Sequence, residues 1–209
     1  MWLKSRAVQM WARRLHVYIS MALLLVVLFF SVTGITLNRP ELFEASKPNI
    51  QSHNLTLPSH LFSIQNDRLE PDAAAFQSFL VEQAGVSGKP SGLDVYAEIE
   101  DGELVVGEVS MDFKGPGYNA SVFADLVMET VEVETTDYGV IALLNDLHKG
   151  RNSGDVWKWF IDITALLMIF FVITGVCLLL PKKKTLNTSI KWMLFGSTLS
   201  WFIYFVAVP

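Results

Sequence analysis

Three long, mostly apolar stretches constrain this chain more than any other feature. The first runs from Val17 to Leu37, the second from Trp159 to Leu180, and the third, which is shorter, from Trp192 to Val208. An α-helix rises about 1.5 Å per residue, so about 20 residues are needed to cross a hydrocarbon core of about 30 Å. The sequence therefore predicts three transmembrane helices.

The first stretch could also be a secretory signal, but it is longer than the apolar core of a signal peptide, which has about 7–15 residues. No small-x-small cleavage site follows it, so we interpret it as an anchor that stays in the protein. Basic residues mark the cytoplasmic side of a membrane protein. They precede the first stretch and separate the second from the third: Lys4, Arg6, Arg13, Arg14, Lys182, Lys183, Lys184 and Lys191. Both groups predict a cytoplasmic N-terminus and place residues 38–156 outside.

The segment between the first two helices is strongly acidic. From Asn38 to Gly150 there are 19 Asp and Glu against 6 Lys and Arg, a net charge of −13, whereas the rest of the chain has 2 against 10, a net charge of +8. Such a surface repels nucleic acid and attracts cations, although it can equally serve only to keep a domain soluble. The single cysteine, Cys177, excludes an intrachain disulfide.

The acidic segment carries the signals of a small α+β domain. A proline start and a glycine stop predict a helix over 71–84. Alternating apolar residues on both sides of Asp101-Gly102 predict a hairpin of strands 93–98 and 103–109. Three further expectations are an irregular segment over 41–70, one long or two short strands over 121–134, and an amphipathic surface helix over 138–147. We therefore divide the chain into 1–37, 38–150, 151–181 and 182–209, of which the second part is the domain.

Two of the four histidines flank the predicted membrane helices. His16 precedes the first apolar stretch on the cytoplasmic side, and His148 precedes the second on the outer side. About 27–30 Å of helix rise separates these levels, so the two side chains of one chain cannot bind the same metal ion. Each could be a metal ligand, because neutral imidazole is a common one. Each could instead have only a structural role: His16 as an interfacial anchor, and His148 as a helix cap.

A short motif occurs in both of the first two helices, as FFSVTG at residues 29–34 and FFVITG at residues 170–175. Because the two helices run in opposite directions, Gly34 is expected level with His148 and Gly175 level with His16. A glycine there leaves room for a flat macrocycle or lets two helices pack closely, and close packing is the commoner use.

These pieces together resemble the PepSY-associated transmembrane family, in particular its short, three-helix members. The residues that carry the resemblance are Arg14-Leu15-His16-Val17-Tyr18, Thr33-Gly34, Leu147-His148-Lys149-Gly150 and Thr174-Gly175. The resemblance implies a membrane α-helical protein of the bacterial inner membrane, with a small periplasmic α+β domain between helices one and two. It also implies haem b and a ferric reductase that supplies ferrous iron to a ferrous iron transporter.

A six-coordinate haem needs two axial ligands, and one chain offers a single histidine at each membrane level. We expect a homodimer in which haem is held by His16 and by His148, because a two-fold axis presents the same residue twice. The glycines Gly34 and Gly175 would border the cofactor. Alternative second ligands are Met193, Met21 and Cys177 for His16, and His53 and His60 for His148.

Ferric iron prefers carboxylate oxygen, so the acidic domain is expected to concentrate it. Asp146 is the first candidate iron ligand, and Asp155, which can also cap the second membrane helix, is the next. Asp162 is expected to form an i,i+4 ion pair with Lys158. His53 and His60 do not have a zinc spacing and are expected to be exposed.

The competing class is a membrane-anchored periplasmic module without enzymatic activity, which binds a peptide or a transporter subunit. A transporter is disfavoured, because three helices without a repeat leave little room for a substrate path.

Overall fold

The computed structural model describes residues 4–43, 47–65, 68–101 and 103–208. The chain forms two compact units. We call Met1–Phe29 with Phe160–Pro209 the helical unit, and Phe30–Trp159 the sheet unit.

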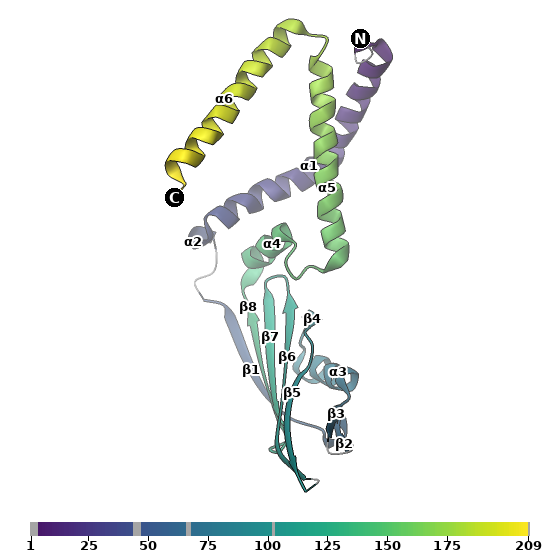
Figure 1. The fold of residues 1–209 in the computed structure, drawn as a ribbon, viewed down its shortest axis with the longest axis vertical. Coiled ribbons are helices and arrows are strands. Elements are labelled where there is room, and N and C mark those ends of the chain that lie inside the picture. The colour runs from purple at the N-terminus through teal and green to yellow at the C-terminus, as the bar shows by residue number, and fades with distance from the viewer. Residues whose placement is uncertain (1–3, 44–46, 66–67, 102, 209) are drawn as a thin grey trace. The chain divides into compact units, whose positions relative to one another are not determined.

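Three helices are long and apolar enough to cross a membrane, which confirms the predicted number. They are α1 (Arg6–Asn38), α5 (Gly154–Leu179) and α6 (Lys183–Ala207), as Figure 1 shows. Within their most apolar windows only 6%, 11% and 0% of the residues are buried by protein. An apolar surface of that extent needs lipid to cover it, since water-soluble chains rarely expose so much. A short helix, α2 (Pro40–Phe43), follows α1.

All three helices begin before the apolar stretches that predict them, and α5 begins at Gly154 instead of Trp159. Helix α1 starts at Arg6 instead of Val17, and α6 starts at Lys183 instead of Trp192. No proline or glycine lies between Arg6 and Gly34, or between Lys183 and Gly196, so nothing in the backbone ends either helix where its polar part begins. Hydropathy marks the lipid-covered part of a helix and not its ends.

The sheet unit is built on a six-stranded antiparallel sheet. Its order is β1-β8-β7-β6-β4, and β5 also pairs with β6 (Figure 1). The strands are β1 (Asn49–Thr56), β4 (Lys89–Pro90), β5 (Asp94–Glu100), β6 (Glu103–Gly115), β7 (Tyr118–Asp125) and β8 (Thr130–Asp137). A separate two-stranded sheet joins β2 (Phe62–Gln65) to β3 (Arg68–Pro71), after the 3-10 turn η2 (Ser59–Leu61).

Helix α3 (Ala73–Ala84) shares one hydrophobic core with the sheet. Phe76 and Leu80 of α3 are fully buried with the strand residues Val109, Val131 and Val133. On β6 and β8 buried and exposed residues alternate, as expected where one face of an antiparallel sheet is covered. The Asp72 carboxylate caps α3 by accepting from the amide of Ala75 at 3.0 Å.

The structure confirms most predictions for this domain. The helix over 71–84 is α3, the hairpin is β5 and β6, residues 121–134 fall in two strands, and the helix over 138–147 is α4 (Gly139–Lys149). Gly102 of the predicted turn lies outside the described residues.

The expectation that residues 41–70 are irregular is wrong. They contain α2, β1, η2 and β2, and β3 begins at Arg68. Strand β1 lies at the sheet edge, and seven of its eight residues are exposed, so its sequence NIQSHNLT has no apolar alternation to reveal it. It forms because β8 provides a pairing partner from Asn49↔Asp137 to Thr56↔Thr130.

Replacing Phe76 with alanine is expected to lower the free energy of unfolding by about 3–5 kcal/mol, because the ring leaves a cavity in the core that α3 shares with the sheet. Val81→Ala on the same helix, where the side chain is 50% exposed, serves as the control and should change it by no more than about 0.5 kcal/mol. Denaturant unfolding followed by circular dichroism measures both. Equal effects of the two variants would contradict the described core.

Candidate functional site

His16, on α1, is held by α5 within the helical unit. Its Nδ1 atom lies 3.1 Å from the Thr174 hydroxyl and 3.2 Å from the carbonyl oxygen of Phe171. The Thr174 hydroxyl in turn donates to that same carbonyl at 2.9 Å. A carbonyl can only accept, so the network assigns the proton to Nδ1 and leaves the lone pair on Nε2.

The His16 ring lies flat against its neighbours. It stacks on Phe171 with ring centroids 4.4 Å apart and an angle of 12° between the planes. A Cβ added at Gly175 would stand 3.3 Å from Cε1 of His16, a contact tighter than side chains normally make. Glycine at this position therefore lets the imidazole approach the helix backbone.

His148, in the last turn of α4, is held in the same way within the sheet unit. Its Nδ1 atom lies 2.6 Å from the Thr33 hydroxyl, and its ring meets Phe30 edge-on at 5.0 Å. A Cβ added at Gly34 would stand 3.7 Å from Cε1 of His148. Partial burial is the main cause that lowers the pKa of His148, and the charge of Lys149 adds to it. Both effects favour the neutral imidazole that binds metal ions.

The two histidine sites follow one plan, in which a Phe-x-x-Thr-Gly motif on a long apolar helix receives the imidazole. The motif occupies residues 30–34 for His148 and residues 171–175 for His16. In both, threonine bonds to Nδ1, phenylalanine contacts the ring and glycine lies against Cε1. Across the described residues, Nε2 of neither ring has a hydrogen-bond partner. At His16, where the Phe171 carbonyl assigns the proton to Nδ1, the Nε2 lone pair is free.

The structure brings each histidine to the glycine that the sequence pairs with it. The imidazole lies beside each of these glycines, at 3.7 Å from a Cβ added at Gly34 and 3.3 Å from one added at Gly175, which is a close-packing contact. Sequence reasoning missed the roles of Thr33 and Thr174. A hydroxyl directly before the glycine in both copies of the motif is the signal that could have revealed them.

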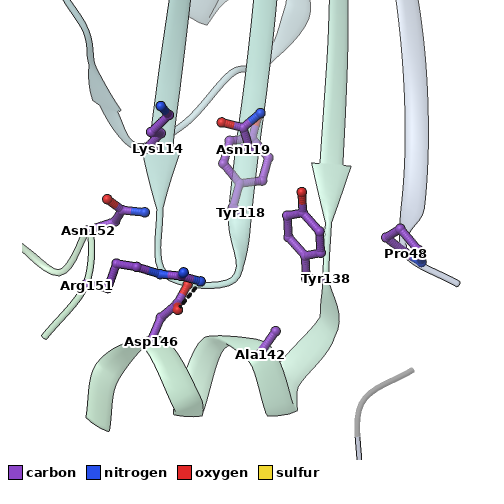
Figure 2. A pocket seen from close by; sticks show the side chains of 9 residues that line it. All are labelled: Pro48, Lys114, Tyr118, Asn119, Tyr138, Ala142, Asp146, Arg151 and Asn152. Atoms are coloured by element: carbon purple, nitrogen blue, oxygen red, sulfur yellow. Dashed lines mark ion pairs between the residues drawn. The ribbon is translucent and has the colours of Figure 1, made fainter. Parts of the chain in front are cut away.

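Helix α4 is fixed at the end of the sheet by a buried carboxylate. Asp146, 5% exposed, accepts from the amide of Gly117 in the β6–β7 turn at 2.9 Å and pairs with Arg151 at 2.6 Å. Figure 2 shows this ion pair at the rim of a pocket between α4 and the strand ends. Gly117 has a φ of +66°, and an added Cβ would stand 2.7 Å from the amide nitrogen of Leu143. The turn therefore requires glycine, and its close approach holds α4 in place.

Two further hydrogen bonds join α4 to the neighbouring helices within the sheet unit. The buried Thr36 hydroxyl of α1 donates to the Asn145 side chain at 2.6 Å. The Trp157 indole of α5 donates to the carbonyl of Leu147 at 2.8 Å. His148 thus belongs to a helix that is tied to the sheet, α1 and α5.

The structure corrects the roles expected for the acidic residues. Both oxygens of Asp146 have protein partners, the Gly117 amide and Arg151, which give this carboxylate a structural role. Asp155 lies inside the first turn of α5, which begins at Gly154, so it is not the cap of that helix. Lys158 pairs with Asp155 at 3.4 Å and not with Asp162, so the i,i+4 prediction is wrong.

The remaining candidates are not gathered around either histidine. Met193 and Met21 are 61% and 65% exposed, and Cys177 is partly buried with its carbonyl accepting from Gln9 at 2.8 Å. His53 lies in β1 and not in a loop, and His60 lies in η2; both are exposed, as expected. Within the described ranges no three His, Cys, Asp or Glu side chains form a metal-binding group.

Replacing Asp146 with alanine is expected to lower the free energy of unfolding of the sheet unit by about 1–3 kcal/mol, because the Gly117 amide loses its acceptor in a buried place. Asp155→Ala removes an exposed carboxylate that also pairs with a basic residue, and should cost at most about 1 kcal/mol. Denaturant unfolding of the two variants in detergent tests this difference. An Asp146→Ala protein as stable as the wild type would refute the structural role.

The fold and the two histidine sites define a class: a membrane protein with three apolar helices, a sheet domain between the first two, and a histidine seated against each of those two helices. A family model described as PepSY_TM-like matches residues 10–209. The chain therefore belongs to the PepSY-associated transmembrane family. No curated protein and no solved structure matches it.

Proposed function

We propose that this protein is a b-type haem ferric reductase of the bacterial inner membrane, which passes electrons to ferric iron and thereby supports ferrous iron uptake. The N-terminus is cytoplasmic and the sheet domain periplasmic in this proposal. The observation that carries it is the repeated histidine site, in which Nδ1 is held by a threonine hydroxyl and Nε2 has no partner in the described structure.

The donor set fits haem. Haem iron binds neutral imidazole, and a ligating histidine usually donates its other ring N–H to an oxygen acceptor that fixes its tautomer. Haem supplies an iron centre that gains and loses one electron. Both sites meet the requirement, because His16 has two oxygen acceptors for its Nδ1 proton and His148 has the Thr33 hydroxyl.

The side chains around each imidazole have distinct tasks. Threonine orients the ring. By accepting a hydrogen bond from Nδ1–H, its hydroxyl makes Nε2 a stronger electron-pair donor to a metal ion. Phenylalanine excludes water from one side of the ring, and glycine lets the ring lie against the helix. Together they keep a fixed, neutral imidazole at a membrane helix, where burial and ligand basicity set the potential of the centre.

Each membrane level needs a second axial ligand, and a second copy of the chain can supply it. A two-fold axis would bring His16 to its mate, and His148 to its mate, without any further ligand in the sequence. Met193 remains the alternative for His16. A homodimer is therefore part of the proposal.

The substrate is ferric iron, and the charge of the domain favours its approach. The net charge of −13 between Asn38 and Gly150 attracts cations over a distance. Since the described residues form no converging metal-binding group, the acidic surface acts through its field and not through a fixed iron site.

His16→Ala and His148→Ala are each expected to lose at least half of the haem bound per chain, because each removes one axial nitrogen. The readouts are the Soret absorbance per chain and ferrous iron formed by cells, detected with a ferrous-specific chelator. His53→Ala, which removes an exposed histidine from β1, is the control and should keep both. A colourless wild-type protein from cells supplied with haem would overturn the proposed function.

The two threonines should differ in their effect. Thr33→Val removes the hydroxyl acceptor of His148 and should weaken haem binding there by about 10–100-fold. Thr174→Val should have a smaller effect, because the Phe171 carbonyl still accepts from His16. Haem titration and the reduction potential of each variant measure this. A larger loss with Thr174→Val would contradict the hydrogen-bond assignment.

A non-enzymatic binding module is the second candidate, and the edge strand β1 favours it. Its eight residues pair with β8 on one side only among the described strands, and an extended peptide can add to such an edge through main-chain hydrogen bonds. A peptide or transporter subunit is the partner that this candidate requires. A redox-sensitive visible spectrum of the pure protein separates the two candidates.

A further inference from the structure

Basic side chains gather around one pocket of the otherwise acidic sheet unit. The pocket measures about 600 Å³ and takes residues from β4, β6 and the loop that leads into α5. Its charged lining residues are Lys89, Lys114, Lys158 and Asp155, and its neutral polar ones are Ser91, Asn152 and Ser153. Lys89 and Lys114 are two of only six basic residues between Asn38 and Gly150, where 19 are acidic. The two lysines thus form a local positive region in a domain whose net charge is negative.

Two of these lysines lie directly opposite each other on paired strands. Lys89 of β4 and Lys114 of β6 are register partners in the antiparallel sheet. Like charges in such a position destabilise a sheet. Gly88 enforces the arrangement, since with a φ of +99° it packs so closely that an added Cβ would stand 2.8 Å from the Lys114 carbonyl. An anion between the two ammonium groups would remove the repulsion.

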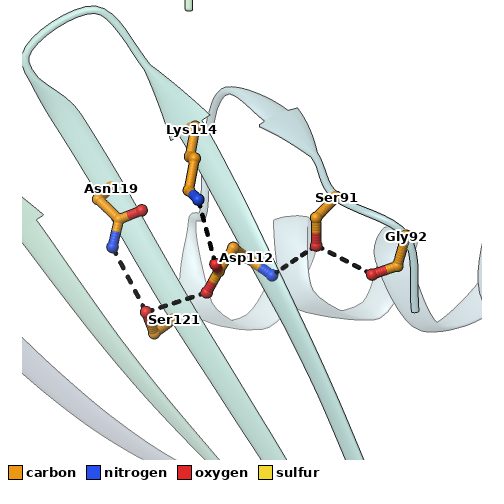
Figure 3. Close-up of polar contacts among 6 residues, drawn as sticks. All are labelled: Ser91, Gly92, Asp112, Lys114, Asn119 and Ser121. Carbon is orange, nitrogen blue, oxygen red and sulfur yellow. Dashed lines mark hydrogen bonds and ion pairs between the residues drawn. The ribbon is translucent and has the colours of Figure 1, made fainter. Parts of the chain in front are cut away.

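Lys114 is held in place by a hydrogen-bonded network, shown in Figure 3. Its ammonium group lies 3.4 Å from Asp112. The Asp112 carboxylate also accepts from Ser121 at 3.1 Å, and the Asp112 amide donates to Ser91 at 3.0 Å. The network joins the segment after β4 to β6 and β7, so the site is built into the sheet.

Lys158 brings the third positive charge to the pocket from the first turns of α5. Asp155 pairs with it, and Asp112 pairs with Lys114, whereas Lys89 has no ion-pair partner within the described ranges. Three lysines and two aspartates, Asp112 and Asp155, therefore give the site one net positive charge. The buried hydroxyl oxygen of Ser153 also lacks a hydrogen-bond partner in the part of the chain that the structure describes.

The position of Lys158 along α5 indicates the depth of the pocket. Trp159, 67% exposed, follows it directly, and the apolar part of a helix long enough to cross a membrane comes next. Tryptophan and lysine at the end of such a helix lie at the level of the lipid headgroups. A lysine at this point of the helix is therefore expected at the level of the lipid phosphodiester groups.

We propose that this pocket binds the phosphodiester headgroup of an anionic phospholipid, with Lys89, Lys114 and Lys158 around the phosphate. The single charge of a phosphodiester matches the one net positive charge of the site. The Asn152 side-chain amide supplies a neutral hydrogen-bond donor. The bound headgroup would relieve the Lys89–Lys114 repulsion and fix β4 and β6 beside the start of α5.

The test uses the full chain in a neutral detergent, titrated with phosphatidylglycerol and, separately, with zwitterionic phosphatidylcholine. Binding is read by native mass spectrometry, and the melting temperature by circular dichroism. The double variant Lys89→Gln/Lys114→Gln should bind phosphatidylglycerol at least about tenfold more weakly, since a lysine near anionic lipid contributes about fivefold. Lys47→Gln/Arg68→Gln removes the same charge elsewhere in the domain and should bind within about twofold of the wild type.

Without lipid, Lys89→Gln should melt no lower than the wild type, because it removes the like-charge repulsion without breaking an ion pair. Phosphatidylglycerol should raise the melting temperature of the wild type more than that of Lys89→Gln/Lys114→Gln. Equal phosphatidylglycerol binding by the two double variants would overturn the proposal. Displacement of phosphatidylglycerol by millimolar inorganic phosphate, but not by chloride of equal ionic strength, would assign the pocket to soluble phosphate instead and overturn the lipid. Haem content plays no part in these readouts, so the result is independent of the proposed reductase.

Discussion

The hydrogen bond between an imidazole Nδ1 and a threonine hydroxyl is the interaction on which both histidine sites depend. Without an acceptor, a ring at a membrane helix would have to bury an unpaired N–H, which costs about 1–3 kcal/mol. Thr174 and Thr33 each contact Nδ1, and Gly175 lets the His16 ring come close to the helix backbone. The tautomer, the ring orientation and the availability of Nε2 all follow from this contact.

The sheet unit contributes more than an acidic surface. Asp146 joins α4 to the β6–β7 turn, and Asn145 joins α4 to α1. The sheet therefore holds the helix that carries His148 in a fixed position. A ligand held on a regular element and supported by its neighbours keeps its geometry better than one on a free loop. This gives the domain a structural reason to lie between the first two long helices in the sequence.

The sequence predicts the features that depend on local pattern. Hydropathy identifies the three long helices, alternation identifies β5 to β8, and the antiparallel course of α1 and α5 pairs each histidine with its glycine. Features that depend on distant partners are not predictable in this way. Strand β1 is stabilised by pairing with β8 and not by its own apolar pattern. The sequence alone gives no sign that the Gly117 amide donates to the Asp146 carboxylate.

The pairing of the first strand with the last has a consequence for biogenesis. Asn49 meets Asp137, so β1 has no place in the sheet until nearly the whole domain has been synthesised. Contacts this far apart in the chain form slowly, because a long loop must close first. Strand β1 therefore remains unpaired during this interval, and its Ser, His and Asn side chains keep the unpaired strand soluble.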